Sequence, residues 1–177
     1  MVDYGLVNIG HGTKSEVVQS YMIMPRYGNN LESYMTKVEK FSKSTTLHIG
    51  LSTLAMLQQI HSAGYVYNDL KLDNILVGFR DKIPSTQTSK DALKTCSLHL
   101  VDFGYATRYI SRRTGQHIEK SDVSNFRGNM IFGSVNQLNF MKTSRRDDLM
   151  SLVYMLVYLL NDGELLDIDL SKDVEKI

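Results

Sequence analysis

The sequence of 177 residues contains one cysteine, two prolines and no tryptophan. Because the single cysteine, Cys96, cannot form an internal disulfide or a zinc site of several cysteines, the chain lacks the usual features of a small secreted scaffold. The first residues also lack the basic region and long apolar run of a signal peptide. We therefore expect an intracellular protein of the cytoplasm or nucleus.

Neither charge nor hydrophobicity is concentrated enough to indicate a nucleic acid or a membrane as a partner. Twenty Lys and Arg oppose nineteen Asp and Glu, so the net charge is +1 and there is no global basic field. The most apolar stretch, residues 149–160, is shorter than the roughly 18 residues that span a bilayer. A hydrophobic content of 42% is enough for a core, so we expect one globular domain or a large part of one.

Two β-type runs near the N-terminus, residues 6–12 and 16–24, predict a hairpin with Gly10 and Gly12 as turn residues. A nucleotide-binding glycine loop is the alternative, but the third glycine is absent and no helix follows. The hairpin is therefore the preferred interpretation.

Three segments have helical periodicity. Residues 30–41 follow a cap at Asn29 or Asn30, and residues 144–160 follow Ser144 with an acidic residue three positions later. A longer helix after residues 44–46 ends before Gly64. It carries an apolar stripe that we expect to lie in the core, formed by Leu47, Leu51, Leu54, Leu57 and Ile60.

Short β-type runs at residues 65–67, 75–77 and 98–101 alternate with polar loops. Residues 79–96 are rich in Lys, Ser, Thr and Asp and predict an exposed insertion. Residues 107–127 are polar and predict irregular structure. This order leaves two polar loops, each bordered by a strand.

The two polar loops carry the residues with the clearest chemical meaning. Asp69, Lys71 and Asn74 lie within YNDLKLDN, and Asp102 opens DFG directly after a hydrophobic run. Phosphoryl transfer requires a carboxylate near the acceptor hydroxyl, a cation near the moving phosphate and oxygen ligands for Mg²⁺. These four side chains supply that set, so the pattern indicates a phosphoryl-transfer site.

YNDLKLDN and DFG resemble the HRDxxxxN and DFG motifs of protein kinases, in the same order and with matching spacing. HSAGYVYNDLKLDNILVG, YMIMPRYGNNLESYM and SRRDDLMSLVYMLVYLL resemble the branch of casein kinase one and the vaccinia-related kinases. The resemblance covers nearly the whole chain. It implies an α+β, protein-kinase-like fold that is partial, with the end of the small lobe in residues 1–24, the hinge in 25–28 and an incomplete, mainly helical large lobe, through its central helix, in 29–177.

Carried over residue by residue, the resemblance implies a catalytic base at Asp69 and a phosphate-neutralising cation at Lys71. It implies Mg²⁺ ligands at Asn74 and Asp102, and it makes ATP and Mg²⁺ the cofactors.

The resemblance also implies an adenine site around the hinge sequence MIMPRYG. Met24 would be the gatekeeper, the carbonyl of Pro25 would accept from the adenine amino group, and the N–H of Tyr27 would donate to the ring. Pro25 can still act as an acceptor, because proline lacks the backbone N–H but keeps the carbonyl. Leu76 would form an apolar floor under the adenine.

Further residues have supporting roles in the resemblance. Tyr67 and Phe103 would belong to a stacked apolar spine that links the lobes. Asp148 would accept backbone N–H groups of the catalytic loop and so hold Asp69 in place. Arg145 and Arg146 keep two interpretations, which are solvated charge at a helix start and contacts to an acidic substrate.

The sequence departs from the family pattern at several positions. Asn68 replaces the arginine that pairs with a phosphorylated activation loop, so we expect no control by such phosphorylation. GSVN at residues 133–136 replaces Ala-Pro-Glu, and Asn129 replaces a threonine that contacts the catalytic aspartate. No glycine-rich loop and no strand lysine precede the hinge, and the helices that the family has after the central helix are missing, so we expect a kinase domain truncated at both ends. We expect this chain to bind Mg²⁺·ATP weakly or not at all and not to catalyse at a useful rate.

The resemblance therefore implies a monomeric protein serine/threonine kinase, or a fragment of one, that transfers the γ-phosphate of ATP to hydroxyls of acidic or pre-phosphorylated protein substrates. The alternative is a catalytically inactive, pseudokinase-like or truncated binding module. The four retained side chains favour the kinase, and the missing phosphate loop favours the binding module.

Overall fold

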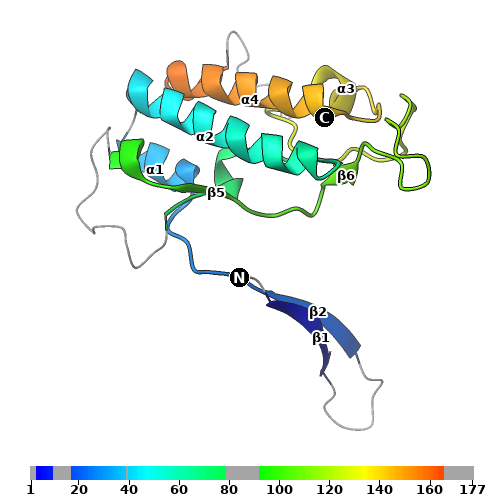
Figure 1. The fold of residues 1–177 in the computed structure, drawn as a ribbon. Coiled ribbons are helices and arrows are strands. Elements are labelled where there is room, and N and C mark those ends of the chain that lie inside the picture. The colour runs from blue at the N-terminus through cyan, green and yellow to red at the C-terminus, as the bar shows by residue number, and fades with distance from the viewer. Residues whose placement is uncertain (1–2, 10–16, 39, 79–91, 166–177) are drawn as a thin grey trace.

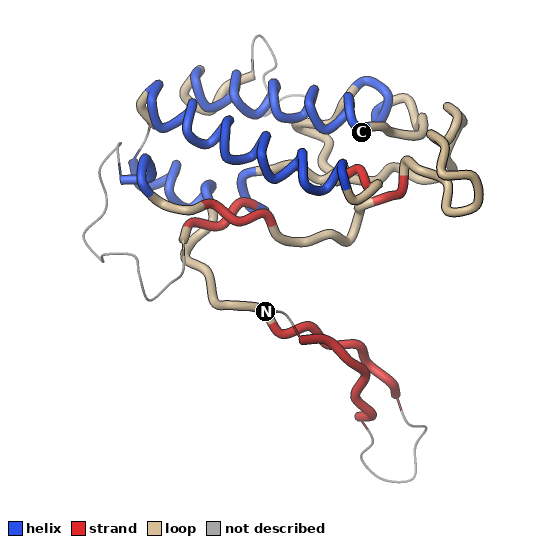
Figure 2. The backbone as a smooth tube through the Cα atoms, viewed as in Figure 1, coloured by secondary structure: helices blue, strands red, loops and turns tan. Residues whose placement is uncertain are grey.

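A computed structural model describes residues 3–9, 17–38, 40–78 and 92–165 of the chain. Its helices lie together above small two-stranded sheets, and an N-terminal hairpin extends away from this body (Figure 1). The arrangement of helices, strands and loops is drawn in Figure 2. None of the described helices is both long and apolar enough to cross a membrane.

The predicted N-terminal hairpin is confirmed. β1 (Asp3–Ile9) pairs antiparallel with β2 (Val17–Ile23), with Asp3 opposite Ile23 and Ile9 opposite Val17. The turn, including Gly10 and Gly12, lies outside the described residues.

Three helices form the body, and the predicted caps explain where they begin and end. α1 (Leu31–Val38) is capped by Asn30, whose Oδ1 accepts from the N–H of Ser33 at 2.9 Å. α2 (Lys43–Ser62) begins slightly earlier than predicted, because Ser42 is its cap. It stops before Gly64, whose φ of +85° is the left-handed conformation that glycine adopts easily.

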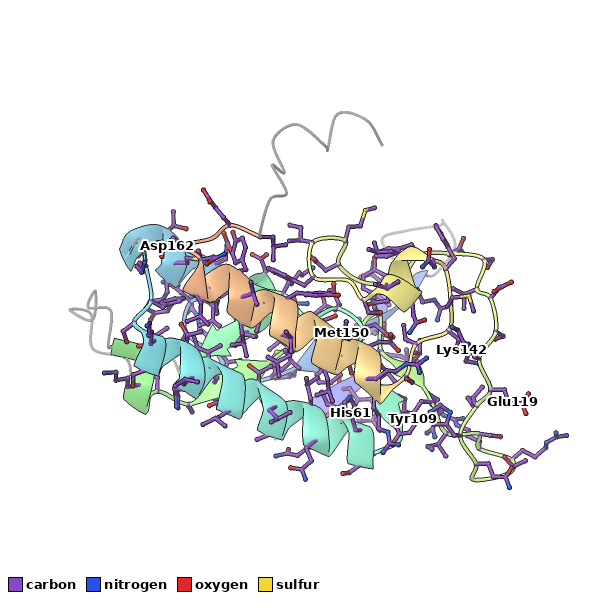
Figure 3. The ribbon with its side chains drawn as sticks, turned by 90° about the horizontal axis from the view of Figure 1, so that it is seen from above. His61, Tyr109, Glu119, Lys142, Met150 and Asp162 are labelled. Atoms are coloured by element: carbon purple, nitrogen blue, oxygen red, sulfur yellow. The ribbon has the colours of Figure 1, made fainter. Side chains whose placement is uncertain are left out.

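The third helix, α4 (Arg145–Leu160), begins at Ser144 as predicted, because the N–H of Ser144 donates to Asp147 Oδ2 at 2.7 Å. It ends before Gly163, where φ is +89°. α2 and α4 lie side by side, as Figure 3 shows from above. The largest fully buried side chains of the described residues are Tyr67, Leu31, Ile49, Leu57, Leu70, Leu72, Ile75, Leu93, Met155 and Leu159.

The predicted core stripe of α2 is wrong at three of its five positions. Leu47, Leu51 and Leu54 are 66%, 69% and 44% exposed. The face of α2 that is buried instead consists of Thr45, Thr46, Ile49, Gly50, Thr53 and Leu57. Small residues on this face let α4 approach closely, since a Cβ on Gly50 would lie 3.1 Å from Leu156 Cδ1.

The three predicted strand runs are confirmed, but their partners were not predicted. β4 (Ile75–Val77) pairs antiparallel with β5 (Leu98–Leu100), and a 3₁₀ turn η1 (Leu72–Asn74) leads into β4. β3 (Tyr65–Val66) pairs with β6 (Thr107–Arg108), which lies in the segment predicted to be irregular. Two-residue strands are too short for periodicity to reveal them.

Two more short elements correct the sequence analysis. α3 (Val135–Leu138) is a single turn that was not predicted. η3 (Ala92–Thr95) lies at the end of the segment predicted as an exposed insertion, and its Leu93 is buried in the core. Residues 79–91 of that segment lie outside the described part.

The segment after β2 is fixed to β4. Gly28 N–H donates to Val77 O at 3.0 Å, and Val77 N–H donates to Asn29 O at 2.9 Å. Asn30 and Leu76 form an isolated bridge. This pairing holds residues 28–30 along β4.

Candidate active site

The loop between β3 and β4 holds Asp69 in a fixed, buried position. Asn74 Nδ2 donates to Asp69 Oδ2 and to the backbone oxygen of Asp69, both at 2.9 Å. Lys71 Nζ lies 3.1 Å from the same Oδ2. The other carboxylate oxygen, Oδ1, is buried and has no hydrogen-bond partner among the described residues. Asp69 therefore presents one free oxygen that can accept a proton.

Asp102 is brought to this loop by the pairing of β4 with β5. Val101 N–H donates to Asn74 O at 3.0 Å, so the residue before Asp102 is bonded to Asn74. Asp102 is exposed, has a left-handed φ of +59°, and accepts from Gly104 N–H at 3.1 Å. The left-handed conformation is uncommon for a residue with a side chain and is typical of functional turns.

Tyr67 lies between these carboxylates and is fully buried. Burial raises the pKa of its phenol well above the usual value, and the nearby carboxylates of Asp69, Asp102 and Asp148 raise it further. The hydroxyl is therefore protonated, and it donates to Val101 O at 2.6 Å. Its ring meets the half-exposed ring of Phe103 edge to face, with centroids 5.4 Å apart. The spine that would link the lobes through these two residues stays a prediction.

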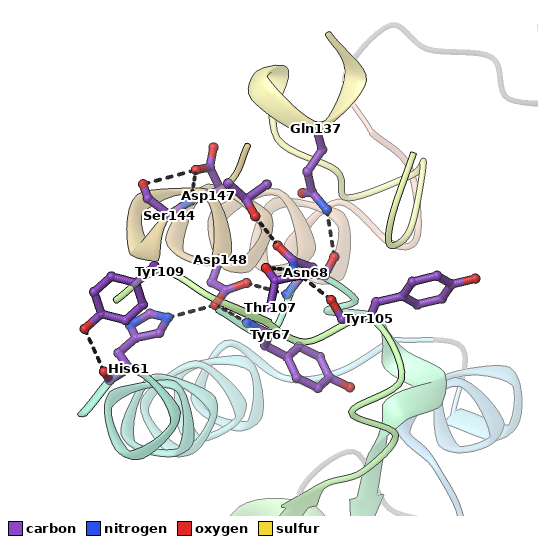
Figure 4. A network of polar contacts seen from close by, with 11 residues as sticks. His61, Tyr67, Asn68, Tyr105, Thr107, Tyr109, Gln137, Ser144, Asp147 and Asp148 are labelled. Atoms are coloured by element: carbon purple, nitrogen blue, oxygen red, sulfur yellow. Dashed lines mark hydrogen bonds and ion pairs between the residues drawn. The ribbon is translucent and has the colours of Figure 1, made fainter. Parts of the chain in front are cut away.

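Asp148, in the first turn of α4, holds the start of this loop from the other side. Its Oδ1 accepts from Asn68 N–H at 2.8 Å, and its Oδ2 accepts from Tyr67 N–H at 2.8 Å. His61 Nε2 is 2.7 Å from the same Oδ2 (Figure 4). The predicted hydrogen bonds from backbone N–H groups of this loop to Asp148 are confirmed. The contribution of His61 was missed, because 87 positions separate it from Asp148 and no sequence spacing reveals the pair.

The residues predicted to surround adenine are only partly brought together. Tyr27 stacks on His99 of β5 with ring centroids 4.3 Å apart, and His99 is the register partner of Leu76. Tyr27 thus lies beside the middle pair of the β4–β5 ladder, to which Leu76 belongs, and both Tyr27 and Leu76 are half-buried. Pro25 is half-buried as well, whereas Met24 is 40% exposed and is not enclosed.

The family model of the protein kinase domain matches residues 7–176. The chain belongs to the protein kinase domain family. The fold is accordingly a part of the protein kinase fold, with mixed helices and strands and small sheets. Kinase domains generally use ATP and Mg²⁺ and act on proteins, so the loop residues of this kinase domain can be compared with what those ligands require.

The donor set of the kinase domain fits Mg²⁺. The amide nitrogen of Asn74 faces Asp69, so Asn74 would offer its amide oxygen to a cation, and Asp102 would offer an exposed carboxylate. In the described parts of the chain no group of three or more His, Cys, Asp or Glu could hold a metal ion. Two protein oxygens suit Mg²⁺, which usually completes its octahedron with water and substrate phosphates.

The side chain of Asn68 makes three hydrogen bonds. Its Nδ2 donates to Tyr105 O at 2.8 Å and to Thr107 Oγ1 at 2.9 Å, and its Oδ1 accepts from Thr143 Oγ1 at 2.6 Å. The side-chain amide is therefore fully used in a neutral network that fixes β6 to the catalytic loop.

Asp147 has a larger role than the helix cap that the sequence predicts. Its Oδ1 also accepts from Ser134 Oγ and Asn136 Nδ2, both at 2.8 Å, so the GSVN motif is bound to the start of α4. Of the neighbouring arginines, Arg145 stacks over the ring of Tyr109 at 5.0 Å. Arg146 is exposed, and its Nε lies 3.9 Å from Asp147 Oδ2. Asn129 Oδ1 accepts from Ile131 and Phe132 N–H in a local turn.

Proposed function

We propose that this kinase domain is a serine/threonine kinase of the casein-kinase-one and vaccinia-related-kinase branch, which transfers the γ-phosphate of ATP to protein hydroxyls. The observation that supports it most directly is the difference between the surroundings of the two carboxylate oxygens of Asp69. One oxygen is held by Asn74 and Lys71, while the other is buried and unpaired among the described residues. A buried carboxylate oxygen that has no partner in the described part of the chain is available to accept a hydrogen bond, and then the proton, from a substrate hydroxyl.

In the proposed reaction Asp69 orients the acceptor hydroxyl and takes its proton as the oxygen attacks the γ-phosphorus. The bond from that phosphorus to the bridging oxygen of ADP breaks at the same time. Bound Mg²⁺·ATP supplies the phosphoryl group and a cation that neutralises it. Lys71 stabilises the negative charge on the moving group, and Asn74 and Asp102 hold the metal. These roles are the ones that the resemblance to protein kinases implies, and charge and positioning supply most of the rate in phosphoryl transfer.

Adenine binds, in this proposal, along residues 25–28, with Met24 as gatekeeper. The carbonyl of Pro25 accepts from the amino group, Tyr27 N–H donates to the ring, and Leu76 lies beneath it. The bonds between residues 28–29 and Val77 support this placement, because they hold the segment against β4.

A cationic pocket beside the catalytic loop supports acidic or pre-phosphorylated substrates. The pocket is about 590 Å³, and Asn68 and Thr107 lie in its wall. No carboxylate lines it among the described residues. Four cationic side chains do, and these are Arg108, Arg112, Arg127 and Lys142. None of these four forms an ion pair within the described ranges. They, rather than Arg145 and Arg146, are suited to an anionic group of the substrate.

The experiment is phosphate transfer from radiolabelled ATP to casein, followed by identification of the labelled amino acids. We expect slow transfer to serine and threonine that stops when EDTA removes Mg²⁺. Label on tyrosine would contradict the proposed specificity. Absence of both transfer and nucleotide binding would support the alternative, a non-catalytic binding module.

The substrate preference has its own test, with a serine-containing peptide and its phosphorylated form. The double variant Arg127→Glu/Lys142→Glu should raise the KM for the phosphopeptide by about tenfold, because two cations become repulsive. Arg146→Glu, which lies outside the pocket, is the matched control. An equal effect of the control would show that the pocket does not bind the phosphate.

A further inference from the structure

The buried side chain of Gln137 joins two segments that are far apart in the sequence. Its Nε2 donates to Asn68 O at 2.8 Å and to Arg127 O at 2.9 Å. Its Oε1 accepts from Ser134 N–H at 3.0 Å. Both amide hydrogens are therefore used on backbone oxygens, one in the catalytic loop and one in the segment before α3. Figure 4 shows the bond to Asn68.

The two segments are also in direct backbone contact at Gly128. A Cβ at this position would lie 2.2 Å from Asn68 O and 2.6 Å from Gln137 Nε2. The φ of Gly128 is +115°, which residues with side chains rarely adopt. Only glycine allows the segment to lie against the carbonyl that Gln137 holds.

This carbonyl belongs to the peptide group that leads into Asp69. Because a peptide group is planar, a hydrogen bond to Asn68 O fixes the plane that ends at the nitrogen of Asp69. On the other side of Asn68, the N–H is fixed by Asp148. The backbone of Asn68, with its left-handed φ of +71°, is thus held at both of its polar groups.

We infer that Gln137 is a positioning residue for Asp69, acting through the carbonyl of Asn68 and coupling the catalytic loop to residues 127–134. The expected effect of Gln137 on catalysis rests on the proposed kinase function. Its expected effect on the backbone position of the loop does not. A merely structural role, in which Gln137 only caps α3 through Ser134, is the competing explanation.

Gln137→Glu separates the two explanations. A glutamate keeps an oxygen that accepts from Ser134 N–H, but it replaces the donor by an oxygen that faces two carbonyl oxygens. Gln59→Glu, an exposed position on α2, makes the same chemical change elsewhere and is the matched control.

The first measurement is amide hydrogen exchange by NMR on the 177-residue chain. In Gln137→Glu the amide of Asn68 should exchange about tenfold faster, because the loop opens more often, whereas the amide of Ser134 should keep its wild-type rate. Exchange at Asn68 within about twofold of wild type would overturn the inference. Equal acceleration at Ser134 and Asn68 would also overturn it, since that result is expected from loss of α3 alone.

The second measurement is phosphate transfer to casein by the same variants. A positioning role predicts that kcat falls about tenfold while the KM for ATP stays within about twofold. A rise in KM with unchanged kcat would contradict the role. If the wild type transfers no phosphate, the proposed function fails for this chain, and the exchange rates alone decide the role of Gln137.

Discussion

The carboxylate of Asp148 and the backbone N–H of Asn68 are joined by a 2.8 Å hydrogen bond across 80 positions of the chain. Asp148 lies in the first turn of α4, where the helix dipole favours negative charge. The same carboxylate binds Tyr67 N–H and His61, so it satisfies three polar groups in the interior. The start of α4 thereby determines the shape of the loop that presents Asp69.

Asp148→Asn should lower the free energy of unfolding by about 3 kcal/mol, because an amide nitrogen would face a buried donor and the charge would be lost. Urea denaturation followed by circular dichroism measures the change. Asp162→Asn is the control, since Asp162 forms an exposed ion pair with Lys40 and should change stability by less than about 1 kcal/mol. Equal losses of unfolding free energy in the two variants would contradict the conclusion that the hydrogen bonds of Asp148 stabilise the fold.

Gly128→Ala should destabilise the chain by more than about 3 kcal/mol, because the new Cβ would overlap backbone and the left-handed φ is strained. Gly115→Ala is the matched control. Gly115 also has a positive φ, +67°, but no atom lies within 4 Å of the position that a Cβ would take there, so about 1 kcal/mol is expected. Thermal unfolding of both variants separates the overlap from the conformational strain.

Leu57→Ala should cost about 2–5 kcal/mol, because Leu57 is fully buried. Leu51→Ala makes the same change six residues earlier on α2. It should change the free energy of unfolding by less than about 0.5 kcal/mol, because Leu51 is 69% exposed. Chemical denaturation of the pair tests which face of α2 is in the core. A large loss in Leu51→Ala would support the stripe that the sequence predicts.

This pair of residues also illustrates what the sequence could and could not predict. The caps at Ser144 and Gly64, the hairpin and the loop motifs follow from local chemistry, and they were predicted. The buried face of α2 did not follow, because threonines and Gly50 pack against α4 while leucines stay exposed. The contacts of Gln137 and His61 with the catalytic loop depend on residues far apart in the chain, so no local pattern indicates them.

The stability of the chain should fall as the pH drops from about 7 to about 5, partly because of His99. Burial lowers the pKa of His99, so the folded state takes up its proton at a lower pH than the unfolded state does. Below about pH 6.5 the unfolded state therefore binds more protons than the folded state, so the free energy of unfolding decreases as the pH falls. His99→Phe keeps a ring against Tyr27 but cannot titrate, and it should show a smaller loss of unfolding free energy between these two pH values. An unchanged loss would contradict this account of His99.

The most direct test of the account is the rate of phosphate transfer from Mg²⁺·ATP to casein by wild type and Asp69→Asn. Cys96→Ser, which lies away from the catalytic loop, is the control. If Asp69 takes the proton of the acceptor hydroxyl, Asp69→Asn should lower the rate by about a hundredfold or more, and Cys96→Ser should leave it nearly unchanged. Equal rates for Asp69→Asn and wild type would contradict the assignment of Asp69 and the mechanism built on it.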